Sequence, residues 1–265
     1  MGVLGLTMGC QTRAWPESEL QVDGRQKHTA HRVTIPPLID GRLDEPAWKD
    51  AASTSAFVSI VGPEKGAPEH TAHAKILWDD THVYFAAEIE EPHLWGTLTE
   101  RDSIIFRNNA FEVFLDPDRD RNNYFEFEIN SLGTFWDLLM DKPYSDGGSA
   151  DNGFDTPGLV SAVHLNGTLN DPSDVDQGWT VEVAIPFTAM VDMRGTAKPP
   201  TSGDVWWVNF SRVQWRLDVT KDGKGYAKRK GDDGSELPEQ YWVWSPIGVR
   251  NMHKPERWGL VMFAQ

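Results

Sequence analysis

The segment Tyr124-Phe-Glu-Phe-Glu-Ile-Asn130 alternates strictly between large apolar and polar side chains. Successive side chains of a β-strand point to opposite faces, so the apolar residues at positions 125, 127 and 129 share one face. The other face carries Glu126, Glu128 and Asn130. The alternation therefore predicts a strand with one face in a hydrophobic core and one face available for polar contacts.

Short segments of similar character follow along the chain, separated by residues typical of turns. The predicted strands are Ala72–Trp78, His82–Glu88, Ala110–Leu115, Tyr124–Asn130, Thr134–Met140, Leu159–Leu165, Gly178–Ile185, Val205–Trp215, Gln240–Trp244 and Trp258–Phe263. Helical periodicity occurs only at Asp44–Ala51, where Asp44 could cap a short helix with Pro46 in its first turn. The pattern predicts an all-β protein, a two-sheet antiparallel β-sandwich with one short N-terminal helix.

The N-terminal residues differ from the rest of the chain. Residues 11–30 are polar and lack periodicity, which is typical of a linker. The segment Gly2–Cys10 reads GVLGLTMGC and resembles the end of a bacterial lipoprotein signal, in which Cys10 would be lipidated. The alternative is an ordinary unstructured N-terminus. We expect residues 1–30 to be a signal remnant or lipid anchor with a linker, and residues 31–265 to be one monomeric domain, secreted or held at the cell envelope.

The charge balance limits the partners of the chain. The formal net charge is −15, which repels nucleic acid and anionic membranes. We therefore expect no nucleic-acid partner and a membrane contact only through a lipid on Cys10. Cys10 is the single cysteine, so no intrachain disulfide can form.

Common catalytic motifs are absent from the sequence, including G-x-S-x-G, H-E-x-x-H and the phosphate-binding loops. Glu126 and Glu128 lie about 7 Å apart along one strand face, a spacing that would permit glycoside hydrolysis. Acidic pairs on one sheet face are also commonly solvated or held in salt bridges. The sequence favours a binding protein, with a glycoside hydrolase as an alternative.

A possible calcium site lies between two predicted strands. Asp116, Asp118 and Asp120 place carboxylates at alternate positions of a hairpin loop, and calcium prefers such oxygen ligands. The loop lacks the glycine and the distal glutamate of an EF-hand. An ordinary acidic turn is the alternative.

Five stretches, in this order, carry a family resemblance: Pro37–Trp48, Ile76–Phe85, Asn109–Pro117, Gly178–Pro186 and Pro255–Gly259. Together they resemble family 9 carbohydrate-binding modules of the DOMON-like superfamily, and further segments are similar to a bacterial branch of that family. The resemblance implies a two-sheet sandwich that binds a poly- or oligosaccharide without cleaving it.

In sugar-binding members two aromatic rings clamp a terminal sugar, and polar side chains bind its hydroxyl groups. The resemblance places one clamping ring at Phe106 and the hydroxyl-binding glutamate at Glu112. The chain departs from the family pattern at two positions: the second ring would fall near Met252, where there is no aromatic residue, and the family's arginine would fall at Glu128. The predicted carbohydrate-binding residues are Phe106, Glu112, Glu126, Glu128, Asn130, Trp136, Arg212, Trp215, Trp244, Met252 and His253. The alternative is that the tryptophans belong to the core and that Arg212 forms an ion pair with Glu126 or Glu128.

Haem binding is the rival function, because other DOMON-like sandwiches hold a b-type haem between Met and His ligands. Met140 with His253 is the conceivable pair, since the adjacent Met252 and His253 are poorly placed to ligate opposite faces of one iron. We expect no haem, calcium as the only candidate cofactor, and a carbohydrate as the ligand.

Overall fold

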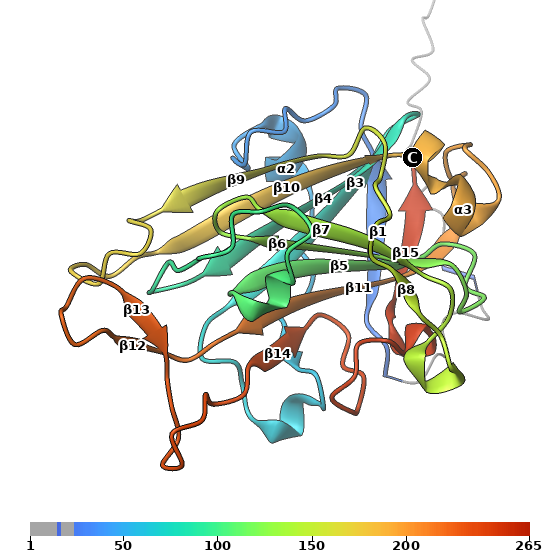
Figure 1. Ribbon diagram of the computed structural model, residues 1–265. Coiled ribbons are helices and arrows are strands. Elements are labelled where there is room, and N and C mark those ends of the chain that lie inside the picture. The colour runs from blue at the N-terminus through green and yellow to red at the C-terminus, as the bar shows by residue number, and fades with distance from the viewer. Residues whose placement is uncertain (1–14, 17–23) are drawn as a thin grey trace, which may run out of the picture.

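The computed structural model describes residues 15–16 and 24–265, shown in Figure 1. Cys10 lies outside the described residues. Among the described residues, no helix is long and apolar enough to cross a membrane. The strands and α-helices are β1 Lys27–Arg32, α2 Pro46–Asp50, β2 Val58–Ser59, β3 Ala72–Trp78, β4 His82–Glu90, β5 Ala110–Asp116, β6 Tyr124–Asn130, β7 Phe135–Met140, β8 Ala150–Asp151, β9 Val160–Asn166, β10 Gly178–Pro186, α3 Val191–Arg194, β11 Val205–Gln214, β12 Leu217–Val219, β13 Tyr226–Lys228, β14 Gln240–Val243 and β15 Gly259–Ala264.

One large sheet contains most of the strands, in the order β8-β7-β6-β5-β11-β15-β1-β3-β4-β10-β9, with β14 on β11 and β2 on β14. β1 is parallel to both of its neighbours, β15 and β3, and thereby joins the two halves of the sheet. The all-β prediction is confirmed. The finer prediction of a two-sheet antiparallel sandwich matches only in part, because the parallel strand β1 joins the two halves into one mixed sheet.

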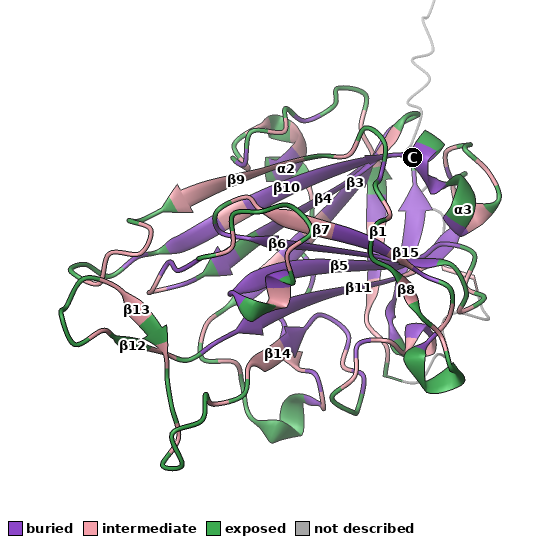
Figure 2. Cartoon of the chain, viewed as in Figure 1, coloured by how far each residue is buried: buried purple, intermediate pink, exposed green. Residues whose placement is uncertain are grey.

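The two halves of the sheet face each other across the main core (Figure 1). The half formed by β3, β4 and β10 supplies Phe85, Trp179 and other buried side chains, and the half formed by β5, β6 and β11 supplies Phe127 and Phe210. Alternation explains these inner faces, since every second residue of each strand is apolar. Figure 2 shows the central strands as buried and the connecting loops as exposed.

Strand β6 is buried on both faces. Its apolar face lies in the main core, as predicted. Its polar face is covered by neighbouring segments, so that Glu126, Glu128 and Asn130 are 6%, 2% and 0% exposed. The polar face of this strand is therefore largely shielded from solvent.

Two local predictions were wrong at the N-terminal end. Strand β1 begins at Lys27, within the segment predicted as a linker, and pairs residue by residue with β15 from Lys27 opposite Leu260. Helix α2 follows Glu45, not Asp44, and has no side-chain cap. The prediction missed β1 because its sequence KHTAHR lacks alternating large apolar residues, although His28 and Ala30 on one of its faces are buried.

Arg212 lies on the core face of β11 and does not face Glu126 or Glu128, contrary to the prediction. Its Nη2 atom lies 3.1 Å from Glu91 Oε2, and both side chains are almost fully buried. The guanidinium also donates to Gln214 Oε1 and lies over the ring of Trp242, 4.9 Å from its centroid. Arg212 therefore forms a buried structural ion pair.

Replacing Arg212 by alanine should destabilise the fold without a specific loss of ligand affinity. Removing one partner leaves Glu91 buried and unpaired, which typically costs about 3–5 kcal/mol. Arg229→Ala is the control, because Arg229 forms an exposed pair with Asp218 and should change the free energy of unfolding by about 0–1 kcal/mol. Urea unfolding of both variants measures the difference. Unchanged stability combined with weaker saccharide binding would return Arg212 to the site.

Candidate functional site

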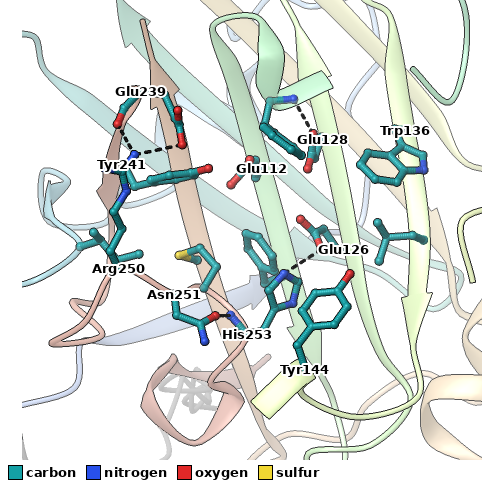
Figure 3. Close-up of a pocket in the computed structure, with 15 residues that line it drawn as sticks. Glu112, Glu126, Glu128, Trp136, Tyr144, Glu239, Tyr241, Arg250, Asn251 and His253 are labelled. Carbon is teal, nitrogen blue, oxygen red and sulfur yellow. Dashed lines mark hydrogen bonds and ion pairs between the residues drawn. The ribbon is translucent and has the colours of Figure 1, made fainter. Parts of the chain in front are cut away.

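A pocket of about 430 Å³ opens on the outer face of β5, β6 and β7 (Figure 3). Strand β14 and the segment 250–253 form the opposite wall. The lining residues are Ile60, Phe106, Glu112, Phe114, Glu126, Glu128, Trp136, Leu138, Tyr144, Glu239, Tyr241, Arg250, Asn251, Met252 and His253. The polar faces of two paired strands therefore look into one concave site.

Three glutamates meet in the middle of this pocket. Glu112 on β5 is the direct partner of Glu128 on β6, and Glu126 precedes Glu128 by two residues on the same face. One carboxylate oxygen from each lies within 4.8 Å of the others, and all three side chains are buried. Glu128 Oε2 accepts a hydrogen bond of 2.8 Å from the Phe106 N–H. Glu112 Oε2 is buried and has no hydrogen-bond partner among the described residues.

Burial and mutual repulsion favour the protonated forms of these glutamates. Burial, followed by repulsion from Glu112, raises the pKa of Glu126 to about 8. Burial, with repulsion from a neighbouring glutamate, raises the pKa values of Glu112 and Glu128 well above the ordinary range. These raised pKa values favour protonated carboxyl groups at neutral pH.

No lysine or arginine in the described part of the chain forms an ion pair with the three glutamates. His253 Nε2 lies 4.0 Å from Glu126 Oε2, but burial lowers the pKa of His253 to about 4 and keeps it neutral at pH 7. Arg250 contacts Glu239 at 2.9 Å, at the rim of the pocket. The three carboxyl groups therefore have no compensating protein cation.

Aromatic rings form the walls on both sides of the carboxyl groups, as Figure 3 shows for Tyr241 on one side and Trp136 and Tyr144 on the other. Tyr144 belongs to a short 3-10 helix after β7, is 50% exposed and packs edge-on against His253 at 4.6 Å between ring centroids. Exposed rings beside buried hydrogen-bonding groups suit a ligand with apolar and polar faces.

The structure brings together seven of the predicted site residues: Phe106, Glu112, Glu126, Glu128, Trp136, Met252 and His253. The sequence analysis missed eight lining residues: Ile60, Phe114, Leu138, Tyr144, Glu239, Tyr241, Arg250 and Asn251. Alternation along β14 could have found Tyr241, because its neighbour Trp242 belongs to the main core and adjacent side chains point to opposite faces.

Four predicted residues lie outside the pocket: Asn130, Arg212, Trp215 and Trp244. Trp244 is 1% exposed and belongs to the main core. Asn130 is fully buried and orders a turn, because its Oδ1 accepts the N–H groups of Leu132 and Thr134. Trp215 donates from Nε1 to the carbonyl of Phe106 at 2.8 Å. Trp215 therefore fixes the backbone of Phe106 and does not line the pocket.

The Asp116 loop brings its three predicted calcium ligands together, with one oxygen from each of Asp116, Asp118 and Asp120 within 4.8 Å of the others. Asp116 is fully buried, and its two oxygens accept the N–H groups of Arg119 and Arg121 at 2.9 and 3.0 Å. These hydrogen bonds shape the loop and leave each Asp116 oxygen with a further lone pair. The carboxylate donor set fits a hard cation such as calcium.

A family described as "Carbohydrate family 9 binding domain-like" matches residues 39–210, more than half of the chain. The chain belongs to this family. The match confirms the resemblance predicted from the sequence and covers β5 and β6, which carry the three glutamates.

Relatives of this family 9 domain-like chain include much longer proteins. It is 29% identical over 163 residues to exoglucanase XynX of Acetivibrio thermocellus, over 60% of this chain and 12% of that protein. It is 26% identical over 222 residues to endo-1,4-beta-xylanase A of Thermotoga maritima, over 77% of this chain and 18% of that protein. The chain therefore matches only a small part of each enzyme.

Two solved structures share the fold of this family 9 domain-like chain. One is a family 9 carbohydrate-binding module of Caldicellulosiruptor kristjanssonii in complex with cellotriose, with a TM-score of 0.58, 16% identity and coverage of 90% of this chain and 94% of that one. The other is a putative carbohydrate-binding protein of Bacteroides uniformis, with a TM-score of 0.61, 16% identity and coverage of 90% and 99%.

The stability of the domain should decrease as the pH rises through the range set by Glu126. Folding raises the pKa of Glu126 from 4.5 to about 8. The contribution of Glu126 to the free energy of unfolding is therefore fully present below pH 4.5 and is lost as the pH rises through about 8. Glu126→Gln cannot titrate and should remove part of this decrease, on the order of 3 kcal/mol between pH 5 and pH 8. Urea unfolding at both pH values measures the effect.

Glu88→Gln is the control for that experiment, because the Glu88 side chain is 53% exposed on β4 and lies outside the pocket. It should leave the pH dependence of the parent protein unchanged. If Glu126→Gln keeps the full pH dependence of the parent protein, Glu126 does not titrate as its burial requires.

Proposed function

We propose that this chain is a non-catalytic module that binds a saccharide in the pocket between β6 and β14. The observation that carries the proposal is the juxtaposition of three buried carboxyl groups with aromatic walls in one cavity of about 430 Å³. Cavities of this size commonly bind small ligands. The family assignment and the cellotriose complex of the related module support the same ligand class.

The chemistry of the walls suits a sugar. The C–H face of a sugar can stack on Trp136 or Tyr144, and its hydroxyl groups can exchange hydrogen bonds with carboxyl groups that both donate and accept when protonated. The strands β5 and β6 hold Glu112 and Glu128 in fixed register. Such preorganised groups on rigid elements need little reordering when a ligand binds.

The arrangement of the carboxyl groups argues against glycoside hydrolysis. A hydrolase needs two carboxyl groups that flank the scissile bond, with different pKa values for the acid and the base or nucleophile. Glu126 and Glu128 lie on one strand face, and burial raises both of their pKa values. Both therefore belong to one wall and favour the same protonation state, so we propose binding without bond cleavage.

The contacts of Met140 and His253 argue against haem binding by this pair. Met140 is fully buried in a hydrophobic cluster that also contains Trp258 and Met252. His253 Nδ1 lies 3.0 Å from the Tyr124 hydroxyl, which occupies that ring nitrogen. A visible spectrum of the purified protein tests the haem alternative, since a bound haem would give a Soret band.

Tyr144→Ala should weaken saccharide binding about tenfold or more and leave the fold intact. Tyr144 is half exposed, and loss of about 1.4 kcal/mol from one stacked ring corresponds to a tenfold change in Kd. Tyr226→Ala removes a ring outside the pocket, at the β12–β13 hairpin, and should leave Kd unchanged. Calorimetry with the best ligand from a glycan array measures both variants. An unchanged Kd for Tyr144→Ala, or release of reducing sugar by the wild type, would contradict the proposal.

Calcium at the Asp116 loop stays a prediction. A cation held only by the folded state stabilises that state, so an excess of chelator should lower the Tm of calcium-loaded protein. Asp118→Asn removes one carboxylate from the exposed part of the loop and should reduce the difference in Tm between protein with and without chelator. Identical melting curves with and without chelator would identify the loop as an acidic turn held by its own backbone hydrogen bonds.

Secretion and lipid attachment at Cys10 also stay predictions.

A further inference from the structure

We propose that the saccharide bound in this pocket carries a free amino group, and that its ammonium lies between Glu112, Glu126 and Glu128. This inference rests on the proposed saccharide-binding function and specifies the ligand class. It starts from three acidic side chains that face one cavity and have no cationic partner in the described part of the chain.

The groups that face the cluster from the surrounding segments do not supply a cation. Burial favours the neutral form of His253, and burial also raises the pKa values of the facing tyrosines above their ordinary range. The one arginine of the lining pairs with a further acidic residue. These facing groups are Tyr124, Tyr144, Glu239, Tyr241, Arg250 and His253.

The spacing of the oxygens fits an ammonium group. One carboxylate oxygen from each glutamate lies within 4.8 Å of the other two, so a single nitrogen can lie no more than about 2.8 Å from all three. About 2.8 Å is the length of a charge-assisted N–H···O hydrogen bond. An ammonium on one carbon has three N–H donors, one for each carboxylate.

A buried oxygen without a partner points to the same ligand. Glu112 is 2% exposed and lines the pocket, yet neither its Oε2 atom nor the Ser211 hydroxyl opposite it on β11 makes a hydrogen bond within 3.5 Å among the described residues. The Ser211 hydroxyl is close enough to lower the pKa of Glu112, but burial outweighs this effect. Leaving such an acceptor unpaired costs about 1–3 kcal/mol, and more when it is charged. A donor supplied by the ligand would remove this cost.

The walls favour an organic cation over a bare metal ion. Calcium and magnesium need six or more oxygen ligands, supplied by protein and water. Here the carboxylates are surrounded by Phe106, Phe114, Leu138 and Met252, and the cavity of about 430 Å³ exceeds the space of one ion with its waters. Aromatic faces such as those of Trp136 and Tyr144 attract an organic cation and stack on its sugar ring.

A matched set of three disaccharides tests the inference on the full chain: β-1,4-linked glucosamine, its N-acetylated form and cellobiose. They differ at the second carbon of each ring, which bears an ammonium, an acetamide or a hydroxyl group. At pH 7 we expect the amine form to bind at least tenfold more tightly than cellobiose. Binding should release protons, because the ammonium stabilises the ionised carboxylates; calorimetry in two buffers of different ionisation enthalpy detects this release.

Glu112→Gln and Glu128→Gln should each reduce the preference for the amine at least tenfold, since one charged partner of the ammonium is lost. Glu88→Gln, on an exposed face of β4, should leave the preference for the amine unchanged. Equal or weaker binding of the amine relative to cellobiose would overturn the inference and leave the saccharide function standing. Absence of any glycan binding would overturn both. Binding of calcium alone that is lost in Glu112→Gln and competes with the amine would assign the cluster to a metal.

Discussion

The antiparallel pairing of β5 with β6 is the contact on which both the core and the pocket depend. Its register places Phe111, Val113 and Leu115 against the apolar face of β6. The same register necessarily places Glu112 beside Glu128 on the opposite face, because side chains alternate along both strands. A slip of one residue would put the carboxyl groups in the core and the phenyl rings in the pocket. The hydrophobic effect that assembles the core therefore also assembles the acidic cluster.

Buried ionisable side chains occur in two different arrangements in this protein. Arg212 and Glu91 are buried as a pair with further hydrogen bonds, so that neither charge is left without a partner. The three glutamates of the pocket are buried without a protein cation and remain protonated through desolvation and repulsion. The first arrangement leaves no buried charge unpaired, whereas the second places carboxyl groups with raised pKa values at a cavity. Perturbed pKa values at a concave site are typical of functional sites.

The covering of the outer sheet face explains why the three glutamates are buried. β14 pairs with β11, and the chain then passes through residues 250–253 before β15 returns to β11. This path carries Met252 and His253 over the ends of β5 and β6, while Tyr144 approaches from the turn after β7. Figure 3 shows these segments converging from far apart in the sequence. The pocket therefore forms only when β14 and the segment before β15 are in place.

The sequence by itself determined the all-β class, each strand of seven or more residues and the two faces of β6, because these depend on a period of two within a few residues. It also determined the family and seven pocket residues. The tertiary structure decided the rest. Polar β1 is a strand only because β15 and β3 flank it. Arg212 and the pocket glutamates belong to different faces because the register of β11 on β5 pairs Arg212 with the core residue Phe111. Trp244 belongs to the core and Tyr144 to the pocket, since a side chain's surroundings depend on contacts between distant segments that no local pattern encodes.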